Sequence, residues 1–232
     1  MRRRIFLQTC AAAAFAATPR FTVAADASPH YYSRARLVWP DGKPVRAAAL
    51  PAHTNLVFHY PFGATPCFLL NLGRRLEAGA ALRTADAHTY RWQGGVGPGR
   101  SIVAYSAICA HKMSYPTRQI SFISYRAVGS QGGNGSSVIR CCSEHSEYDP
   151  AHGAAVVHGP APQPLAAILL DYDQRADELY AVGTLGGEMF DEFFSKFGFR
   201  LSLDVGGKAH QPSGDMCEVV ELAKYCRQEV QC

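Results

Sequence analysis

The chain has 232 residues, of which 47% are hydrophobic and 18% charged, so it can bury a core and is not a disordered polypeptide. Its formal net charge of +4 comes from the N-terminus: four of the 23 Lys and Arg residues lie before residue 26, where no Asp or Glu occurs, and the rest balance the 19 acidic residues. This balance excludes the basic surface expected of a protein that binds nucleic acid or an anionic membrane.

Residues 1–27 have the pattern of an export signal. Three arginines precede an apolar run from Ile5 to Ala17, and small residues follow it. The run is about 13 residues long, shorter than the roughly 20 that a membrane-spanning helix needs, so we expect no firm membrane span. The sequence Arg3-Arg4-Ile5-Phe6-Leu7 looks like a twin-arginine signal, which predicts a periplasmic protein that is exported already folded. A weak, uncleaved anchor is the alternative.

From about residue 36 the sequence predicts short strands separated by turns rich in Gly and Pro. The pattern indicates a mainly β fold, an antiparallel sandwich or small barrel, over residues 28–187. We expect strands at Asn55–Tyr60, Cys67–Leu72, Ser101–Tyr105 and Ile120–Tyr125, and a last hairpin from Ala166–Leu170 and Glu178–Val182.

Residues 188–232 are predicted to form a short helical extension. Phenylalanines at near-helical spacing predict a packing helix over Glu188–Phe197, and Gly206–Gly214 is predicted to be a linker. A last helix is expected over Asp215–Gln231, in which Cys217 and Cys226 would lie on opposite faces. Disulfides between Cys232 and either of these cysteines are both left open.

Two Cys/His motifs carry the chemistry. The first is Cys109-x-His111, and the second ends in Cys142-x-x-His145. Two thiolates and two imidazoles suit a soft or borderline metal. A tetrahedral zinc site normally uses other spacings, whereas an iron–sulfur cluster with two Cys on one iron and two His on the other fits one Cys and one His in each motif. Zinc, or cysteines and histidines with no ligand role, are the alternatives.

Further motifs accompany this pair. Ser146-x-Tyr148 follows the second motif, and Gly159-Pro160-Ala161-Pro162 comes a few residues later. Together these motifs resemble the Rieske iron–sulfur family, and residues 50–187 look most like the small subunit of arsenite oxidase. The resemblance implies one [2Fe–2S] cluster per chain, a cluster-binding subdomain and a proline loop over the cluster, with Pro160 in that loop. It also implies that Ser146 and Tyr148 donate hydrogen bonds to sulfur and raise the reduction potential. The implied metal ligands are Cys109, His111, Cys142 and His145.

The second motif departs from the family pattern. Aligning residues 146–149 with the family puts Cys141 on the ligand cysteine and Glu144 on the ligand histidine. Keeping the Cys-x-x-His spacing selects Cys142 and His145, which we favour because loop length varies more easily than ligand reach. Under the first of these alignments, Cys141 and His145 would bind the metal across one extra residue. Ser114 stands where many family members have a cysteine that links the two motif loops, so we expect no such disulfide, and the Gly/Ser-rich segment 129–137 looks like an insertion.

The resemblance implies an electron-transfer subunit of an oxidoreductase, not a catalyst by itself. We expect it to pass single electrons from a larger subunit, such as a molybdenum enzyme, to a cytochrome c-type acceptor. One alternative is the Rieske subunit of a quinol-oxidising cytochrome bc-type complex. Another is a non-redox docking subunit whose site is degenerate or filled by zinc.

Overall fold

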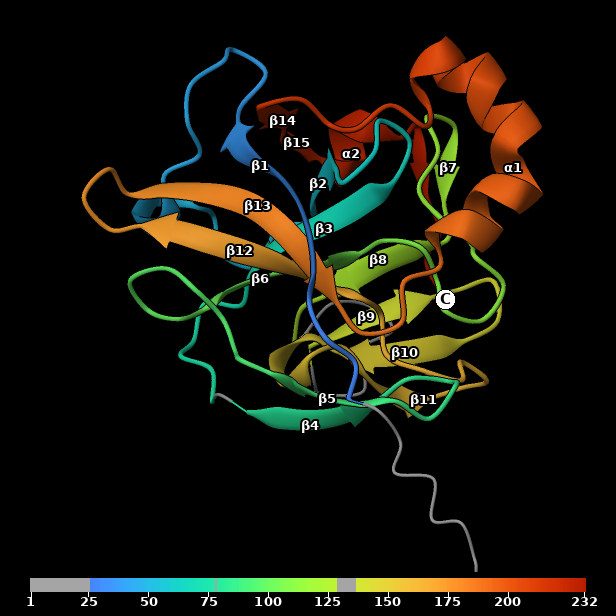
Figure 1. Ribbon diagram of the computed structural model, residues 1–232, viewed down its shortest axis with the longest axis horizontal. Coiled ribbons are helices and arrows are strands. Elements are labelled where there is room, and N and C mark those ends of the chain that lie inside the picture. Colours follow the sequence, from blue (N-terminus) through green and yellow to red (C-terminus); the bar gives the residue numbers. More distant parts are fainter. Residues whose placement is uncertain (1–25, 78, 129–136) are drawn as a thin grey trace, which may run out of the picture.

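The computed structural model describes residues 26–77, 79–128 and 137–232, which form a mainly β molecule (Figure 1). The prediction of a mainly β fold is confirmed. Most of the predicted export signal and most of the segment 129–137 lie outside the described residues.

The largest sheet has eight strands in the order β14-β1-β13-β12-β6-β3-β2-β15. Every pairing is antiparallel except that between β1 and β14. Three of its strands and the last hairpin lie where the sequence predicts them. The strands are β1 (His30–Val38), β2 (Leu56–His59), β3 (Pro66–Asn71), β6 (Ile102–Ser106), β12 (Ala167–Asp173), β13 (Glu178–Leu185), β14 (Met216–Glu218) and β15 (Val220–Glu221).

A single stretch of chain brings the two ends of this sheet together. The end strands β14 and β15 are separated only by Val219, so the sheet nearly closes on itself. The prediction of a helix over residues 215–231 is wrong here, because residues 216–218 and 220–221 form strands. Cys217 and Val219 are buried while Met216 and Glu218 are exposed, which is the two-residue period of a strand. Only α2 (Leu222–Tyr225) is helical there.

A second sheet of four strands packs below the large one (Figure 1), in the order β11-β10-β9-β8. Its strands are β8 (Ile123–Arg126), β9 (Val138–Cys141), β10 (Ser146–Asp149) and β11 (Ala155–His158). The predicted strand over 120–125 is divided at Phe122, because β7 (Ile120–Ser121) pairs instead with β16 (Gln228–Glu229). A separate hairpin joins β4 (Ala80–Arg83) to β5 (Thr89–Trp92).

The inner strands β2, β3 and β6 of the large sheet are buried on both faces. In β3, Cys67 and Leu69 belong to the core inside the curled sheet, whereas Phe68 and Leu70 belong to the core between the two sheets. Successive side chains of a strand point to opposite faces, so one strand serves both cores. Cys67 is fully buried, with an exposed fraction of 0%.

The helix α1 (Phe190–Val205) confirms the predicted packing helix and extends beyond it. Phe190, Phe193 and Phe194 are buried and pack with Tyr115 and Leu201 in a third core. Short 3₁₀ turns occur at Ala47–Ala49, Pro150–His152 and Gly206–Lys208. Among the described residues, no helix combines the length and the apolar character that a membrane crossing requires.

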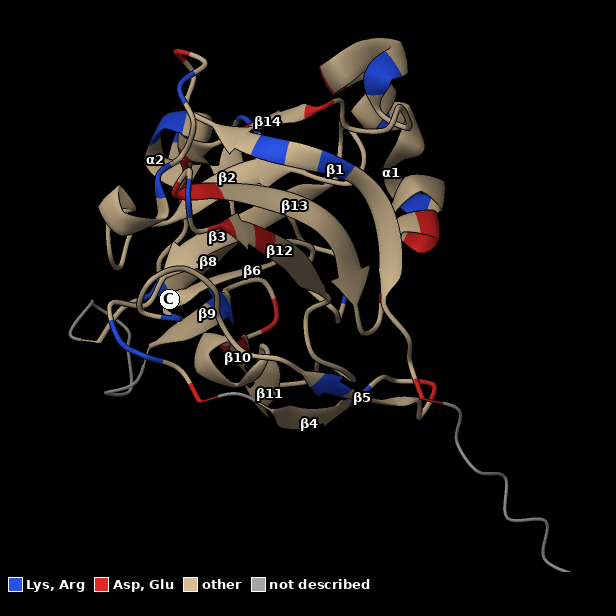
Figure 2. Cartoon of the chain, turned by 60° about the vertical axis from the view of Figure 1, so that its left-hand side comes forward, with Lys and Arg blue, Asp and Glu red and all other residues tan. Residues whose placement is uncertain are grey.

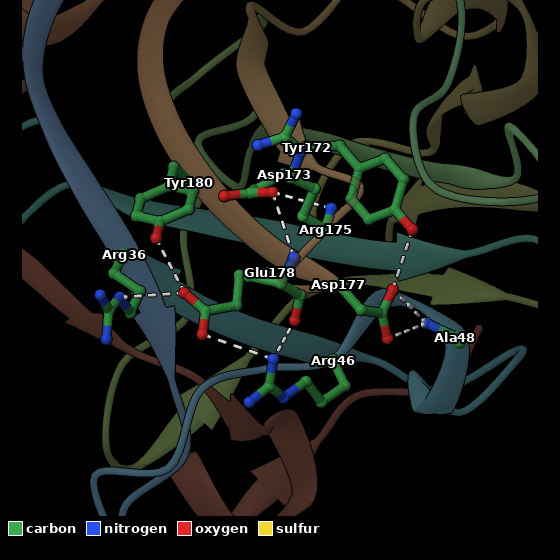
Figure 3. Close-up of polar contacts among 10 residues, drawn as sticks. Arg36, Arg46, Ala48, Tyr172, Asp173, Arg175, Asp177, Glu178 and Tyr180 are labelled. Atoms are coloured by element: carbon green, nitrogen blue, oxygen red, sulfur yellow. Dashed lines mark hydrogen bonds and ion pairs between the residues drawn. The ribbon is translucent and has the colours of Figure 1, made fainter.

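Ion pairs connect the β12–β13 hairpin to β1 and to Arg46. Figure 2 shows basic residues along β1 beside acidic residues on β12 and β13, and Arg34 pairs with Asp171 at 2.9 Å. In Figure 3 the buried carboxylate of Glu178 accepts a 2.8 Å hydrogen bond from the Tyr180 hydroxyl. It also lies 3.3 Å from Arg36 Nε and 3.4 Å from a guanidinium nitrogen of Arg46. These contacts compensate the burial of the Glu178 charge, so we assign them a structural role.

Candidate metal centre

The first loop (residues 107–114) follows β6 and turns back on itself. The Cys109 backbone N–H donates to the Ser114 carbonyl at 2.9 Å, and the Met113 N–H donates to the Cys109 carbonyl at the same distance. Met113 has a φ of +61°, in the left-handed region that such a reversal uses. The loop therefore holds Cys109 in the core between the sheets, with an exposed fraction of 1%.

The second loop (residues 142–145) is the turn of the β9–β10 hairpin. Cys141 and Ser146 face each other across the hairpin. Ile139, Cys141, Ser146 and Tyr148 are buried on one face, whereas Arg140 and Glu147 form an ion pair of 3.3 Å on the other. One face of the hairpin therefore presents a thiol and two hydroxyls to the first loop.

Cys109 and Cys141 meet where the two loops approach each other. The Tyr148 hydroxyl lies 3.2 Å from Cys109 Sγ and accepts a 3.1 Å hydrogen bond from the Ala110 N–H. Hydrogen bonds from the Cys141 thiol, the Tyr148 hydroxyl and the backbone N–H groups of His111 and Lys112 lower the pKa of Cys109 to about 6, although burial acts to raise it.

The same contacts raise the pKa values of Cys141 and Tyr148, the side chains that contact Cys109. The pKa of Cys141 is raised, first because its thiol donates to Cys109 and then because it is buried. The pKa of Tyr148 is raised by burial and by the charge of Cys109. The geometry thus favours a Cys109 thiolate that receives donated hydrogen bonds, and a thiolate is the form in which cysteine binds a metal.

Two polar atoms of the two cysteine-bearing segments have no hydrogen-bond partner among the described residues. They are Nδ1 of His111 and Oγ of Ser146, and both are buried. A buried polar atom without a partner is unfavourable by about 1–3 kcal/mol, so such atoms need an explanation. A bound metal group would provide one, with His111 as a ligand and Ser146 as a hydrogen-bond donor.

Cys142 requires a correction, because its sulfur forms a disulfide with Cys232. In that state it has no free thiolate, and Cys141 is the second-motif cysteine beside Cys109. The alternation of buried and less buried side chains along β9 indicates which cysteine faces the core. Ile139 and Cys141 share the buried face, and Cys142 follows on the other side. The two pairings left open for Cys232 do not form, since Cys217 and Cys226 are free buried thiols.

Two neighbouring residues, Glu144 and His145, are the candidates for the fourth metal ligand. His145 is exposed and has a φ of +57°, which closes the turn. Glu144 reaches across to the first loop, where its carboxylate lies 3.2 Å from Lys112 Nζ. Among the described residues, no three His, Cys, Asp or Glu side chains are gathered closely enough to hold a metal ion. The structure therefore brings Cys109 and Cys141 together, but not His111 and His145 with them.

The proline loop (residues 159–164) lies against the second loop. A Cβ on Gly159, whose φ is +88°, would meet the His145 carbonyl oxygen at 2.4 Å and Ser146 Cα at 2.6 Å. Only glycine permits this close approach. Pro160 is exposed, at the outer side of the loop. The loop thus packs closely on the backbone of the second loop at Gly159.

The segment after residue 187 supports both cysteine loops. On the first loop, Lys196 of α1 donates a 2.9 Å hydrogen bond to the Lys112 carbonyl. Just beyond that loop, the Tyr115 ring packs edge-on against Phe193 with a centroid distance of 4.8 Å. On the second loop, the support is the disulfide to Cys232. None of these contacts could be read from local sequence patterns.

The residues present fit a two-iron, two-sulfur cluster in three respects. Cys109 and Cys141 belong to the same buried cluster, a histidine nitrogen is buried without a partner, and the Tyr148 hydroxyl lies beside the Cys109 sulfur. The fit is incomplete at the other two ligands, because neither His111 nor a second-loop residue is gathered with the two cysteines among the described residues.

The chain was compared with known proteins. No protein-family model matches it. Among solved structures it is similar to the soluble domain of Rieske protein II from Sulfolobus acidocaldarius, with 25% sequence identity and a TM-score of 0.46. The similarity covers 66% of this chain and 78% of that one.

Proposed function

We propose that this protein is a Rieske-type electron carrier that holds one [2Fe–2S] cluster between its two cysteine loops. The observation that carries the proposal is the junction of these loops. There Cys109 and Cys141 lie in one buried cluster with Tyr148, whose hydroxyl is 3.2 Å from Cys109 Sγ, and the buried His111 Nδ1 and Ser146 Oγ have no partner among the described residues. One-electron transfer is the chemistry that such a cluster supplies when bound.

The residues of the chain have distinct tasks in this proposal. Cys109 and Cys141 bind as thiolates, and His111 binds through a neutral imidazole. Tyr148 donates a hydrogen bond to Cys109 sulfur, which favours additional negative charge there, and Ser146 is the second hydroxyl donor. The fourth ligand comes from the second loop, as His145 or, in the other alignment, as Glu144. The proline loop, with Pro160, limits access of water from that side.

The finer assignments rest on the sequence resemblance. We propose a periplasmic protein, exported by a twin-arginine-type signal, that serves as the small subunit of an arsenite-oxidase-like enzyme. Its partners would be a larger redox subunit and a cytochrome c-type acceptor. The net charge outside the first 25 residues is near zero, so we expect these partners to be recognised by local surface contacts and not by the overall electrostatic field of the protein.

Electron paramagnetic resonance of the dithionite-reduced full-length protein tests the proposal, together with assays of iron and zinc. We expect about two irons per chain and the rhombic signal of mixed Cys/His ligation. Zinc in place of iron, or the absence of both after anaerobic expression with iron supplied, would contradict it. That second result would favour the docking subunit without redox chemistry.

A further inference from the structure

Cys141 and Cys142 are adjacent in sequence but serve different neighbours. Cys141 is fully buried on the hairpin face whose Tyr148 hydroxyl lies 3.2 Å from Cys109 Sγ, and both cysteines belong to the core between the sheets. Cys142 is half-buried and bonded to Cys232, ninety residues away in sequence, with a Cα–Cα distance of 5.7 Å. Because neighbouring side chains of a strand point in opposite directions, the position of one sulfur constrains that of the other. The disulfide therefore acts directly on the residue next to a candidate ligand.

The segment that carries Cys232 is itself anchored. Gln228 and Glu229 pair in parallel with Ile120 and Ser121, and the Val230 N–H donates to the Ser121 carbonyl at 2.9 Å. The side chain of Arg126 donates a 2.7 Å hydrogen bond to the Val230 carbonyl. Residues 226–232 thus lie fixed along residues 118–126.

Arg126 strengthens this anchorage because it is buried. Its side chain is only 7% exposed, and it lies 3.4 Å from the carboxylate of Glu229. A buried cation needs such a partner, so the tail and residues 120–126 stabilise each other. Cys232 is consequently bonded to a part of the molecule that is held in place by its own contacts.

Besides its packing against the proline loop, the second loop has noncovalent attachments to two other described segments. The Cys142 N–H donates to the Phe122 carbonyl at 2.6 Å, and Glu144 pairs with Lys112 where both side chains are partly exposed. An exposed ion pair contributes about 0–1 kcal/mol. The disulfide is therefore the strongest connection between this loop and the rest of the fold.

We propose that Cys232 is a positioning residue for the metal centre: through its disulfide with Cys142, the anchored segment 226–232 holds the second loop so that Cys141 stays opposite Cys109. The inference deepens the proposed function, since it concerns the same thiol pair. It adds Cys232, which lies outside the two Cys/His motifs, to the residues that position Cys109 and Cys141.

The test uses the full-length protein and the double variant Cys142→Ser/Cys232→Ser, which introduces no new free thiol. The probe is Cd²⁺ alone, added to iron-free protein and followed by the ultraviolet absorption of cadmium–thiolate bonds. Cys109→Ser identifies the part of the signal that belongs to the Cys109–Cys141 pair. We expect the double variant to bind Cd²⁺ at this pair about tenfold more weakly, as for loss of other residues that orient metal ligands.

Hydrogen exchange supplies a second readout. Residues 141–149 should exchange faster in Cys142→Ser, in Cys232→Ser and in the double variant to the same extent, because each change removes the same bond. Unchanged Cd²⁺ affinity in the double variant, even with lower global stability, would overturn the proposal. So would absence of cadmium–thiolate absorption at Cys109 in the parent protein.

The two proposals fail in different ways. If the parent protein binds no iron but the double variant weakens Cd²⁺ binding, the positioning role stands and the Rieske assignment falls. If iron is bound normally and Cd²⁺ affinity is unaffected, the electron carrier stands and the positioning role falls.

Discussion

The hydroxyl of Tyr148 lies 3.2 Å from the sulfur of Cys109, although 39 residues separate them in sequence. It reaches this position because β10 packs one face against the first loop, and the same hydroxyl accepts the Ala110 N–H. The contact links the two motifs through a side chain that is fully buried. Its role as a donor to sulfur can be tested with and without iron.

Replacing Tyr148 by Phe should raise the pKa of Cys109 from about 6 by roughly one to two units, since a hydrogen bond to a charged group contributes about 1.5–3 kcal/mol. Ultraviolet titration of thiolate absorption in iron-free protein measures this change. With iron bound, the midpoint potential should fall. The matched control is Tyr125→Phe, whose hydroxyl contacts His53 at 3.3 Å and should change neither quantity. An unaltered pKa and potential in Tyr148→Phe would remove Tyr148 from this role.

Serine replacement of Cys141 and of Cys142 should give different results. Cys141→Ser removes a sulfur next to Cys109, so we expect loss of bound iron. Cys142→Ser leaves that sulfur in place and breaks the bond to Cys232, so iron should be retained, although less firmly. Iron content after gel filtration measures both. Iron lost only in Cys142→Ser would restore the preference for Cys142 as the ligand.

His145→Gln and Glu144→Gln separate the two candidates for the fourth ligand. If His145 binds iron, His145→Gln should abolish the rhombic spectrum, while Glu144→Gln only breaks the ion pair with Lys112 and changes stability by about 0–1 kcal/mol. The reverse pattern would assign the position to Glu144. Electron paramagnetic resonance with parallel iron analysis distinguishes these results, and retention of the spectrum in both variants would exclude both residues.

His59 should make the protein sensitive to acid. Burial, with a contribution from Arg118, lowers the pKa of His59 from 6.5 to about 4. Between these values the unfolded chain binds the proton more readily than the folded protein does, so stability is lost as the pH falls through this window. The loss amounts to roughly 2–3 kcal/mol. His59→Gln, which can keep a hydrogen bond to the Tyr225 hydroxyl now 3.2 Å from Nε2, should show a smaller loss.

Urea unfolding at pH 7 and at pH 4.5 measures this difference. Other groups also titrate in the window, so the quantity to compare is the fall in unfolding free energy of the parent protein minus that of the variant. Equal falls in the two proteins would show that His59 is not the group responsible.

Two glycines provide a matched pair for the proline loop. Gly159→Ala places a Cβ against backbone atoms of His145 and Ser146 at a positive φ, so the proline loop must move. We expect a destabilisation of about 1–3 kcal/mol and faster hydrogen exchange in residues 155–164. Gly198→Ala in α1 meets no atom within 4 Å and should stabilise the protein by about 0.5–1 kcal/mol. A tolerated Gly159→Ala with unchanged exchange would show that the loop is not held there.

The sequence by itself determined the mainly β architecture, the β12–β13 hairpin and the aromatic helix, because each follows from a local period of side chains. It also supplied Cys109, His111, Ser146 and Tyr148 as residues of one candidate centre. The tertiary structure decided that Cys141 and not Cys142 faces Cys109, because that depends on the register of β9 against its neighbours. It also decided that residues 216–221 close the large sheet and that Cys232 pairs with Cys142. Contacts between distant segments arise from packing in three dimensions, and no local pattern encodes them.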